Sequence, residues 1–229
     1  HQLCDRMLRA VGQLPDFSRA DAFARLEDGF AALEIAEEAR FDVLIVDEGQ
    51  DFRPAWRDRL LGLLRPDGAA WWLEDPMQNL YDRPEVALPG WPRLRSERNY
   101  RSPIEAINLL NRVLEPEQAF AAGSPVGGAE VEVLTWADAD ELLDCSKRAI
   151  TRAIGLGFRR DMIALLTFRG REHSRFTGLT RLGAHALRAF TGRYDLLGSP
   201  LYSEGEILID SVYRFKGQSA PCVIFTEID

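Results

Sequence analysis

Lysine is nearly absent from this chain of 229 residues: Lys147 and Lys216 occur, and the other 26 of its 28 basic residues are arginine. Neither lysine follows a glycine, so the sequence contains no G-x-x-x-x-G-K-[ST] loop, whose backbone amides and lysine hold phosphate groups. The sequence also lacks an apolar run of the ~18 residues that a membrane helix needs, and no leading segment resembles a signal peptide. We therefore expect a cytoplasmic protein without a membrane partner.

Cysteine is scarce as well. The three cysteines, Cys4, Cys145 and Cys222, share no C-x-x-C spacing, which argues against a disulfide framework and a zinc site. Hydrophobic residues make up 46% of the chain and aromatic residues 10%, enough to bury a core, so a disordered or collagen-like protein is excluded. The length allows one large domain or two small ones.

The net charge of −8 argues against a protein that coats nucleic acid with its whole surface. The charge is uneven, because residues 1–92 hold 10 Arg against 18 Asp and Glu, whereas residues 93–229 hold 18 basic and 18 acidic residues. Within the second part, residues 147–193 carry 11 Arg and Lys against Asp161 and Glu172. This basic stretch is either a solvated face or a local phosphate-binding surface.

Two apolar segments in the first part of the chain predict strands. The run from Asp42 to Asp47 shows no alternation, which is typical of a strand buried on both faces in a parallel sheet. Residues 54–64 predict a helix that ends before a turn at residues 66–68, and residues 70–73 predict a second strand.

The second part of the chain is predicted to alternate in the same way: a helix from Ser102-Pro103 to Pro116, a strand over Val131–Trp136, a helix over 138–154, a buried strand over Met162–Phe168, a largely helical segment over 171–190, and strands over 206–213 and 222–226. Strands that alternate with helices indicate an α/β fold with parallel sheets. The stretch near residues 82–98 is the predicted domain boundary.

Both strands of the first part end in acids, Asp47-Glu48 and Glu74-Asp75. Ligands of open parallel sheets bind beyond the carboxyl ends of the strands, where one or two carboxylates can hold Mg²⁺ on a phosphate and a neighbouring Glu can accept a proton from water. A strand-end acid can instead cap the next helix or solvate the strand end.

Four segments in order resemble motifs of the UvrD/Rep-like superfamily 1 DNA helicases. They are FDVLIVDEGQDF (41–52), similar to the Walker B motif, LEDPMQNLY (73–81), LRSERNYRS (94–102) and SVYRFKGQSAPCVIF (211–225), and the opening HQLC is similar to a further element of these proteins. The resemblance implies RecA-like parallel sheets of the P-loop NTPase type. Residues 1–92 would form the C-terminal part of the first core domain, and residues 93–229 a truncated second core domain without the large accessory insertion. We expect a fragment of a longer protein, which begins after the phosphate loop and ends before the last arginine-bearing motif.

The resemblance implies an ATP-dependent helicase or translocase, with ATP and Mg²⁺ as cofactors of the full-length protein and single-stranded or partly duplex DNA as its partner. Asp47 would hold Mg²⁺, Glu48 would activate the attacking water, Gln78 would sense the γ-phosphate, and Arg101 would stabilise the charge on the transferred phosphate. The other residues implied to bind the nucleotide, or to link its site to neighbouring parts of the protein, are Gln50, Asp51, Tyr100 and Gly217. Those implied to lie near the nucleic acid are Tyr81, Ser211, Tyr213 and Lys216.

The sequence departs from the family pattern in several places: Glu74 replaces a Gly, no R-G-A follows Tyr81, Tyr213 replaces a His, and Ser219 replaces an acidic residue that contacts the ribose. Two other hypotheses remain open. The chain could be a non-catalytic nucleic-acid-binding module, which the basic stretch would support, or Asp47, Glu48, Asp51 and Asp75 could form a metal-dependent nuclease cluster. Since the phosphate loop is missing, we expect no ATPase activity from the chain alone.

Overall fold

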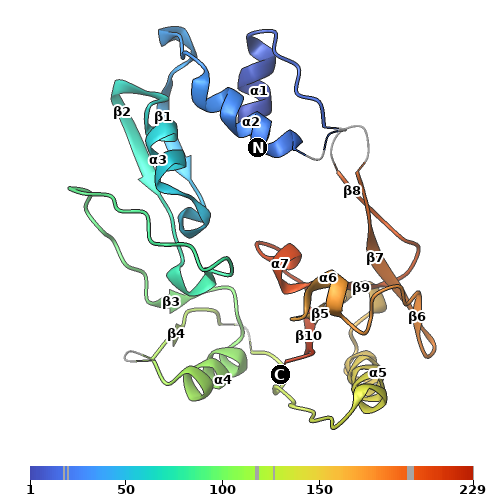
Figure 1. The fold of residues 1–229 in the computed structure, drawn as a ribbon. Helices are drawn as coiled ribbons and strands as arrows, with labels where there is room; N and C mark the ends of the chain where they lie inside the picture. The colour runs from blue at the N-terminus through green and yellow to red at the C-terminus, as the bar shows by residue number, and fades with distance from the viewer. Residues whose placement is uncertain (18, 20, 117–118, 126, 195–198, 229) are drawn as a thin grey trace. The chain divides into compact units, whose positions relative to one another are not determined.

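The computed structural model describes residues 1–17, 19, 21–116, 119–125, 127–194 and 199–228, which divide into two compact units, His1–Leu94 and Arg95–Asp229 (Figure 1). Both units combine helices with parallel strands, so the predicted α/β class is confirmed at that level. No helix in the described ranges is both long enough and apolar enough to cross a membrane.

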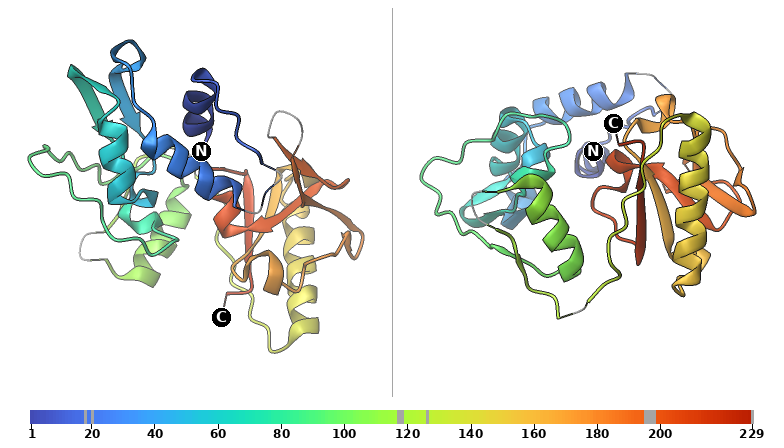
Figure 2. Two further views of the ribbon diagram at one scale, coloured as in Figure 1. Left: turned by 45° about the horizontal axis from the view of Figure 1, so that its top comes forward. Right: turned by 90° about the horizontal axis from the view of Figure 1, so that it is seen from below.

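The first unit contains helices and strands in the order α1 (Gln2–Ala10), α2 (Ala22–Ala32), β1 (Phe41–Val46), α3 (Pro54–Leu61) and β2 (Leu64–Trp72), with short 3-10 helices η1 (Glu37–Ala39), η2 (Gly49–Asp51) and η3 (Pro76–Gln78). Helices α1 and α2 lie side by side (Figure 2). Arg59 joins α3 to this pair, because its guanidinium donates to the carbonyls of Phe30 and Leu33.

Strands β1 and β2 pair in parallel, but the sheet differs from the prediction in two ways. The predicted turn at residues 66–68 is wrong: these residues belong to β2 and bulge out of it, because the step from Phe41 to Val43 in β1 faces the step from Leu64 to Ala69 in β2. The prediction that β1 is buried on both faces is also wrong. Val43 and Ile45 are exposed while Leu44 and Val46 are buried, since only one face of this two-stranded sheet is covered.

The second unit contains β3 (Arg98–Asn99), α4 (Ile104–Leu114), β4 (Ala121–Ala122), α5 (Ala139–Gly155), η4 (Arg160–Met162), β5 (Ile163–Thr167), α6 (Gly170–His173), β6 (Arg181–Leu182), β7 (His185–Tyr194), β8 (Pro200–Tyr202), β9 (Ile207–Ser211), α7 (Val212–Phe215) and β10 (Cys222–Thr226). Its main sheet has the order β10-β5-β9-β7-β6, in which the first four strands are parallel. Strands β6 and β8 pair with β7 in antiparallel fashion, and β3 pairs with β4 in parallel.

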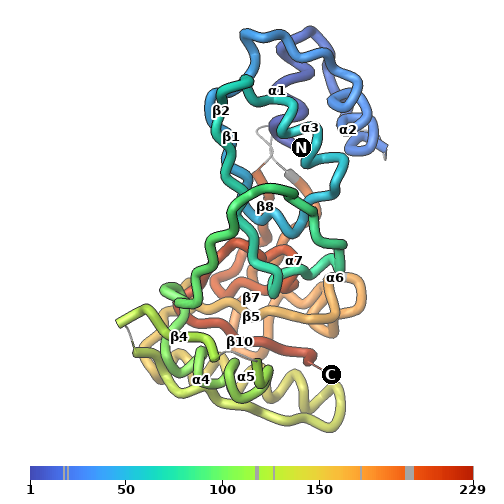
Figure 3. Tube along the Cα trace, turned by 90° about the vertical axis from the view of Figure 1, so that its left-hand side faces the viewer, coloured from blue at the N-terminus to red at the C-terminus, as the bar shows by residue number. Residues whose placement is uncertain are grey.

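The core of the second unit lies between this sheet and α5, which runs along it (Figures 2 and 3). Every residue of β5 is buried, and Leu142 and Ile150 of α5 pack into the same cluster. Asp138 caps α5 by accepting hydrogen bonds from the backbone N–H groups of Asp140 (3.0 Å) and Glu141 (2.9 Å). The predicted helix over 138–154 and the predicted strands over 162–168 and 222–226 are therefore confirmed.

Two predicted elements of this unit do not form. Residues 171–190 are not largely helical, because helix α6 ends at His173 and the segment continues as the hairpin of β6 and β7. Pairing of β7 with β9 buries Leu187, and this tertiary contact overrides the local helical pattern. Residues Val131–Trp136 form no strand, since no neighbouring strand pairs with them among the described residues, and Val131 and Val133 are exposed.

Candidate functional site

The residues that follow β1 and β2 lie together at one edge of the sheet. We call Asp47–Asp51 and Leu73–Gln78 the acidic edge. The backbone N–H of Leu73 donates to the carbonyl of Val46, and that of Gly49 donates to the carbonyl of Leu73, both at 2.8 Å. Parallel pairing thus brings the two acidic strand ends, which are far apart in the sequence, into one site.

Glu48 turns the chain sharply after β1. Its backbone is left-handed, with φ 55° and ψ 44°, a conformation that costs a non-glycine residue about 1–2 kcal/mol. The carboxylate of Asp47 accepts a hydrogen bond from the backbone N–H of Glu48 (3.0 Å), and the carbonyl of Glu48 accepts one from Asp51 (2.9 Å). These contacts hold the strained turn in place, with Asp47 exposed and Glu48 half-buried.

Gly49 is required by the neighbouring strand. A β-carbon at this position would overlap the indole ring of Trp72, which lies directly against the glycine backbone. The indole is also packed edge-on against Phe52, with ring centroids 5.5 Å apart. Trp72 therefore fixes the loop that carries Glu48 by packing.

Gln50 connects the two halves of the acidic edge. Its side chain is 6% exposed, its amide N–H donates to the Glu48 carboxylate (2.6 Å), and its amide oxygen accepts from the backbone N–H of Asp75 (2.9 Å). The amide of Gln78 in turn donates to the carboxylate of Asp75 (2.6 Å). The predicted site residues Glu48 and Gln78 are thus joined through Gln50 and Asp75.

The carboxylates of the acidic edge do not form a metal cluster. Within the described ranges, no three His, Cys, Asp or Glu side chains are grouped so that they could hold a metal ion. The nuclease hypothesis for Asp47, Glu48, Asp51 and Asp75 therefore lacks its ligand set. A single exposed carboxylate such as Asp47 fits an Mg²⁺ ion that arrives with nucleotide phosphates, because such an ion keeps most of its waters.

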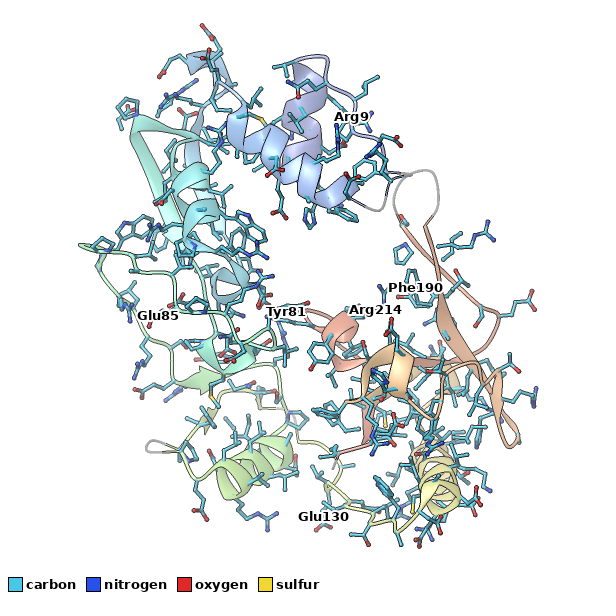
Figure 4. All side chains as sticks on the ribbon, in the orientation of Figure 1. Arg9, Tyr81, Glu85, Glu130, Phe190 and Arg214 are labelled. Atoms are coloured by element: carbon cyan, nitrogen blue, oxygen red, sulfur yellow. The ribbon has the colours of Figure 1, made fainter. Side chains whose placement is uncertain are left out.

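Tyr81 lies in the loop that follows η3, labelled in Figure 4, and its side chain is 49% exposed. The guanidinium of Arg83 lies 5.2 Å from the Tyr81 ring centre and 5.3 Å from that of Trp56 on α3. Asn79 fixes this loop, since its side chain bonds both the N–H (3.0 Å) and the carbonyl (2.7 Å) of Arg83. Sequence reasoning missed Arg83 and Trp56, because nothing in the local sequence indicates that they meet.

In the second unit, Tyr100 and Arg101 lie between β3 and α4. The ring of Tyr100 is 66% exposed and occupies the space that a β-carbon on Gly123 would need. Asn99 holds the turn, because its side-chain oxygen accepts from the backbone N–H groups of Arg101 (2.9 Å) and Ser102 (2.8 Å). The serine before Pro103 predicts a helix cap at Ser102; this is wrong, since Pro103 occupies the N-cap position of α4 without a side-chain bond.

The last predicted residues surround the junction of β9 and α7. Ser211 is 3% exposed and caps α7, because its hydroxyl accepts from the backbone N–H of Arg214 (3.4 Å). Tyr213 is 44% exposed, Lys216 is half-buried, and Gly217 has a left-handed backbone with φ 78°.

Arg214, which the sequence did not single out, anchors α7. Its guanidinium donates to the buried carboxylate of Asp210 (3.3 Å) and lies 3.7 Å from the ring centre of Phe190, as Figure 4 illustrates. This contact ties the segment that carries Tyr213 and Lys216 to the main sheet.

Several cations of the basic stretch 147–193 are paired with acids. Arg159 binds Asp161 at 2.9 Å, and Arg152 binds Glu132 at 3.1 Å. Lys147 and Arg160 pair with Asp144 and Glu206. The side chain of Arg171 lies outside the described part of the chain. The positive surplus of the stretch is therefore partly neutralised on the surface.

Neither a protein-family model nor a curated protein matches the chain.

Proposed function

We propose that the chain is part of the motor of a UvrD/Rep-like superfamily 1 DNA helicase, which is built on RecA-like domains and couples ATP hydrolysis to movement along single-stranded DNA. The proposal is supported by four motif-like segments in the family order. The observation that carries it is the arrangement of the acidic edge. Glu48, expected to activate the attacking water, and Gln78, expected to sense the γ-phosphate, are connected by hydrogen bonds through Gln50 and Asp75.

The acidic edge would carry the hydrolytic chemistry. Bound with ATP, Mg²⁺ would neutralise charge on the phosphates, and the exposed carboxylate of Asp47 would hold it. Glu48 would accept the proton of the attacking water, for which its carboxylate must be held within hydrogen-bond reach. The bond from Gln50 at 2.6 Å orients that carboxylate.

The second unit carries three further residues that the resemblance assigns to nucleotide binding. Tyr100 offers an exposed aromatic face on which adenine could stack. Arg101 follows in a turn that Asn99 holds, and its guanidinium suits charge that spreads over phosphate oxygens. Gly217 would let the backbone approach the nucleotide closely, because it carries no side chain.

Tyr81, Tyr213 and Lys216 would contact the nucleic acid. Exposed aromatic rings stack on any base, so this contact would be independent of sequence. We expect Tyr81→Ala to weaken binding of an oligo-dT strand by 1–3 kcal/mol, roughly 5- to 150-fold, and Tyr81→Phe to retain the affinity. Fluorescence anisotropy with a labelled oligonucleotide measures both.

Phe17→Ala is a matched control for this experiment, since Phe17 is a similarly exposed aromatic residue of the same unit between α1 and α2. Its affinity for the strand should equal that of the unchanged protein. Equal losses for Phe17→Ala and Tyr81→Ala would show that the effect comes from general surface changes and would count against a base-stacking role for Tyr81.

Phosphate release tests whether the chain alone is inactive. We expect the chain alone to release no phosphate from ATP with single-stranded DNA present, because it has no phosphate loop with a lysine. Robust turnover that Glu48→Gln abolishes would contradict this expectation. Cleavage of a plasmid in Mg²⁺ or Mn²⁺ would favour a nuclease instead.

A further inference from the structure

An open groove lies beside α5, where the hairpin of β6 and β7 packs against this helix (Figure 2). The stem of Lys147 lies against the hairpin turn, where a β-carbon added to Gly183 would meet it at 2.9 Å. The groove extends along α5 to Gly155, which makes it about 12 Å long at a helical rise of about 1.5 Å per residue. We call this the α5 groove, and its other lining residues are Arg148, Thr151, Arg152, Ala184 and His185.

His185 forms the floor of the α5 groove, since it is 6% exposed. The hydroxyl of Thr151 donates its single hydrogen to the carbonyl of Lys147 (2.9 Å), so the contact between this hydroxyl and Nε2 of His185 (3.2 Å) must be donated by the imidazole. In the neutral ring Nδ1 is therefore an acceptor, and this buried atom has no hydrogen-bond partner within the described part of the chain. Protonation would make Nδ1 a donor and place a positive charge beneath the groove.

The charges that act on this imidazole are positive. Burial lowers the pKa of His185, and the charges of Arg160 and Arg181 lower it further. Arg181 is held on the hairpin by its bond to the carbonyl of Ala184 (3.0 Å), and Arg160 pairs with Glu206 at 3.8 Å. An anion that entered the groove would oppose these charges and favour the protonated imidazole.

Three cations of α5 line the groove, and their present contacts leave them able to bind a ligand. Lys147 and Arg152 each pair with one acid, but all four side chains are at least 43% exposed, and ion pairs in water are weak and screened by salt. The guanidinium of Arg148 donates to the sulfur of Cys145 (3.4 Å), which is a weak acceptor. A phosphate could therefore replace these contacts.

We propose that the α5 groove binds the phosphate backbone of a nucleic-acid strand, as a contact separate from Tyr81, Tyr213 and Lys216. The choice of nucleic acid as the ligand rests on the proposed function, whereas the groove contains none of the residues that this function uses. Cations spread along about 12 Å of helix suit a chain of phosphates better than one small anion. The site also gives a role to the basic stretch 147–193 of an otherwise acidic protein.

The imidazole of His185 is a local probe of phosphate in the groove. Its ring protons are titrated by NMR on the full chain from about pH 8 to about pH 5, with and without oligo-dT that carries no terminal phosphate, and His185→Gln assigns the signals. The phosphodiesters stay singly charged over this range, so the strand itself takes up no proton. We expect the pKa of His185 to rise when the strand binds, because a nearby negative charge favours the imidazolium.

The same linkage predicts how the affinity depends on pH. Oligo-dT should bind at least about threefold more tightly at about pH 5.5 than at about pH 7.5, since binding and protonation of His185 favour each other. His185→Gln should remove this difference and retain binding at the higher pH. Fluorescence anisotropy with a labelled strand measures both proteins.

The salt dependence tests the cations. We expect Arg148→Gln and Arg152→Gln each to lower the slope of log affinity against log salt by about 0.7, the value for one phosphate contact to a single strand, which is about a fivefold loss at 0.1 M salt. Both side chains lie on the helix surface, so the variants should fold. Arg112→Gln is the matched control, because Arg112 is an exposed arginine of α4 in the same unit outside the groove, and its slope should not change.

The possible results separate this inference from the proposed function. Equal binding by the groove variants and Arg112→Gln, with the pKa of His185 unchanged by the strand, would overturn the groove site. If Tyr81→Ala still weakens binding in that case, the proposed function stands. A chain that binds no oligo-dT at any salt concentration would overturn both. If inorganic tripolyphosphate raises the pKa of His185 and oligo-dT does not, the groove binds a free anion and the nucleic-acid ligand is wrong.

Discussion

Each unit contains a glutamate with a left-handed backbone close to the end of a parallel strand. Glu48 has φ 55° after β1, and Glu227 has φ 58° after β10. Glu48 is half-buried and bonded by Gln50, whereas Glu227 is 1% exposed. The carboxylate of Glu227 accepts from the Thr167 hydroxyl and from the backbone N–H of Arg175 (2.7 Å).

The difference lies in what covers the strand ends. In the second unit β10 pairs with the fully buried strand β5, and the residues after β5 fold over Glu227. In the first unit the sheet has two strands and one covered face, so Asp47 and Glu48 stay accessible. The same backbone turn thus serves packing in one unit and leaves an acid available for chemistry in the other.

The largest difference between the two units is expected when each carboxylate is removed. We expect Glu227→Ala to lower the free energy of unfolding of the second unit by about 2–4 kcal/mol, because it leaves buried donors without an acceptor. Glu48→Ala should lower that of the first unit by less, about 1 kcal/mol, because it leaves one buried donor, the amide of Gln50, without its acceptor. Urea denaturation with hydrogen exchange of β5 and β1 amides measures both, and equal losses would contradict the distinction.

A smaller effect is expected at Gly49. An alanine there would overlap the Trp72 indole and should cost the first unit about 1–3 kcal/mol by overpacking. Trp72→Leu in the same protein should restore part of the loss. Gly155→Ala is the control, because its β-carbon meets nothing within 4 Å and its stability should not fall. If Gly49→Ala lowers the free energy of unfolding no more than Gly155→Ala does, Trp72 does not fix the Glu48 loop.

The smallest expected effect is a pH dependence confined to the second unit. Burial lowers the pKa of His185, with contributions from Arg160 and Arg181, so the unfolded chain binds a proton more readily than the folded one. Stability of this unit should therefore fall as the pH drops from about 7.5 to about 5.5, through the ordinary range of histidine. The unfolding temperature of His185→Gln, measured across this pH range, should no longer depend on pH in this way. If His185→Gln and the unchanged protein show the same pH dependence, other groups cause it.

The fold was predictable where local pattern and tertiary environment agree. The apolar run of β5 is buried throughout, and Asp138 starts α5 as its sequence indicates. The local sequence pattern gave wrong predictions where the structure of a segment depends on a strand that is distant in the sequence. Strand β7 forms because β9 pairs with it, and β1 is exposed on one face because few strands surround it. Neither partner is visible in the local sequence.

The candidate site was also predictable only where the local sequence determines it. Acids at two strand ends were predicted, and parallel pairing brings them together. The bond from Asp75 to Gln50 could not be foreseen, because it joins residues 25 positions apart by their side chain and backbone. Arg83 and Trp56 meet only through the folded loop after η3. The resemblance supplied roles for single residues, and the structure adds how three of them, Glu48, Gln50 and Gln78, are connected through Asp75.

The most direct measurement of the central claim is the affinity for an oligo-dT strand with and without a saturating, non-hydrolysed Mg·ATP analogue. If the acidic edge couples a triphosphate to Tyr81, the two affinities should differ about fivefold or more, and Gln78→Ala should make them equal. Identical affinities for the unchanged protein, with binding still weakened by Tyr81→Ala, would contradict this coupling within the chain and favour a nucleic-acid-binding module.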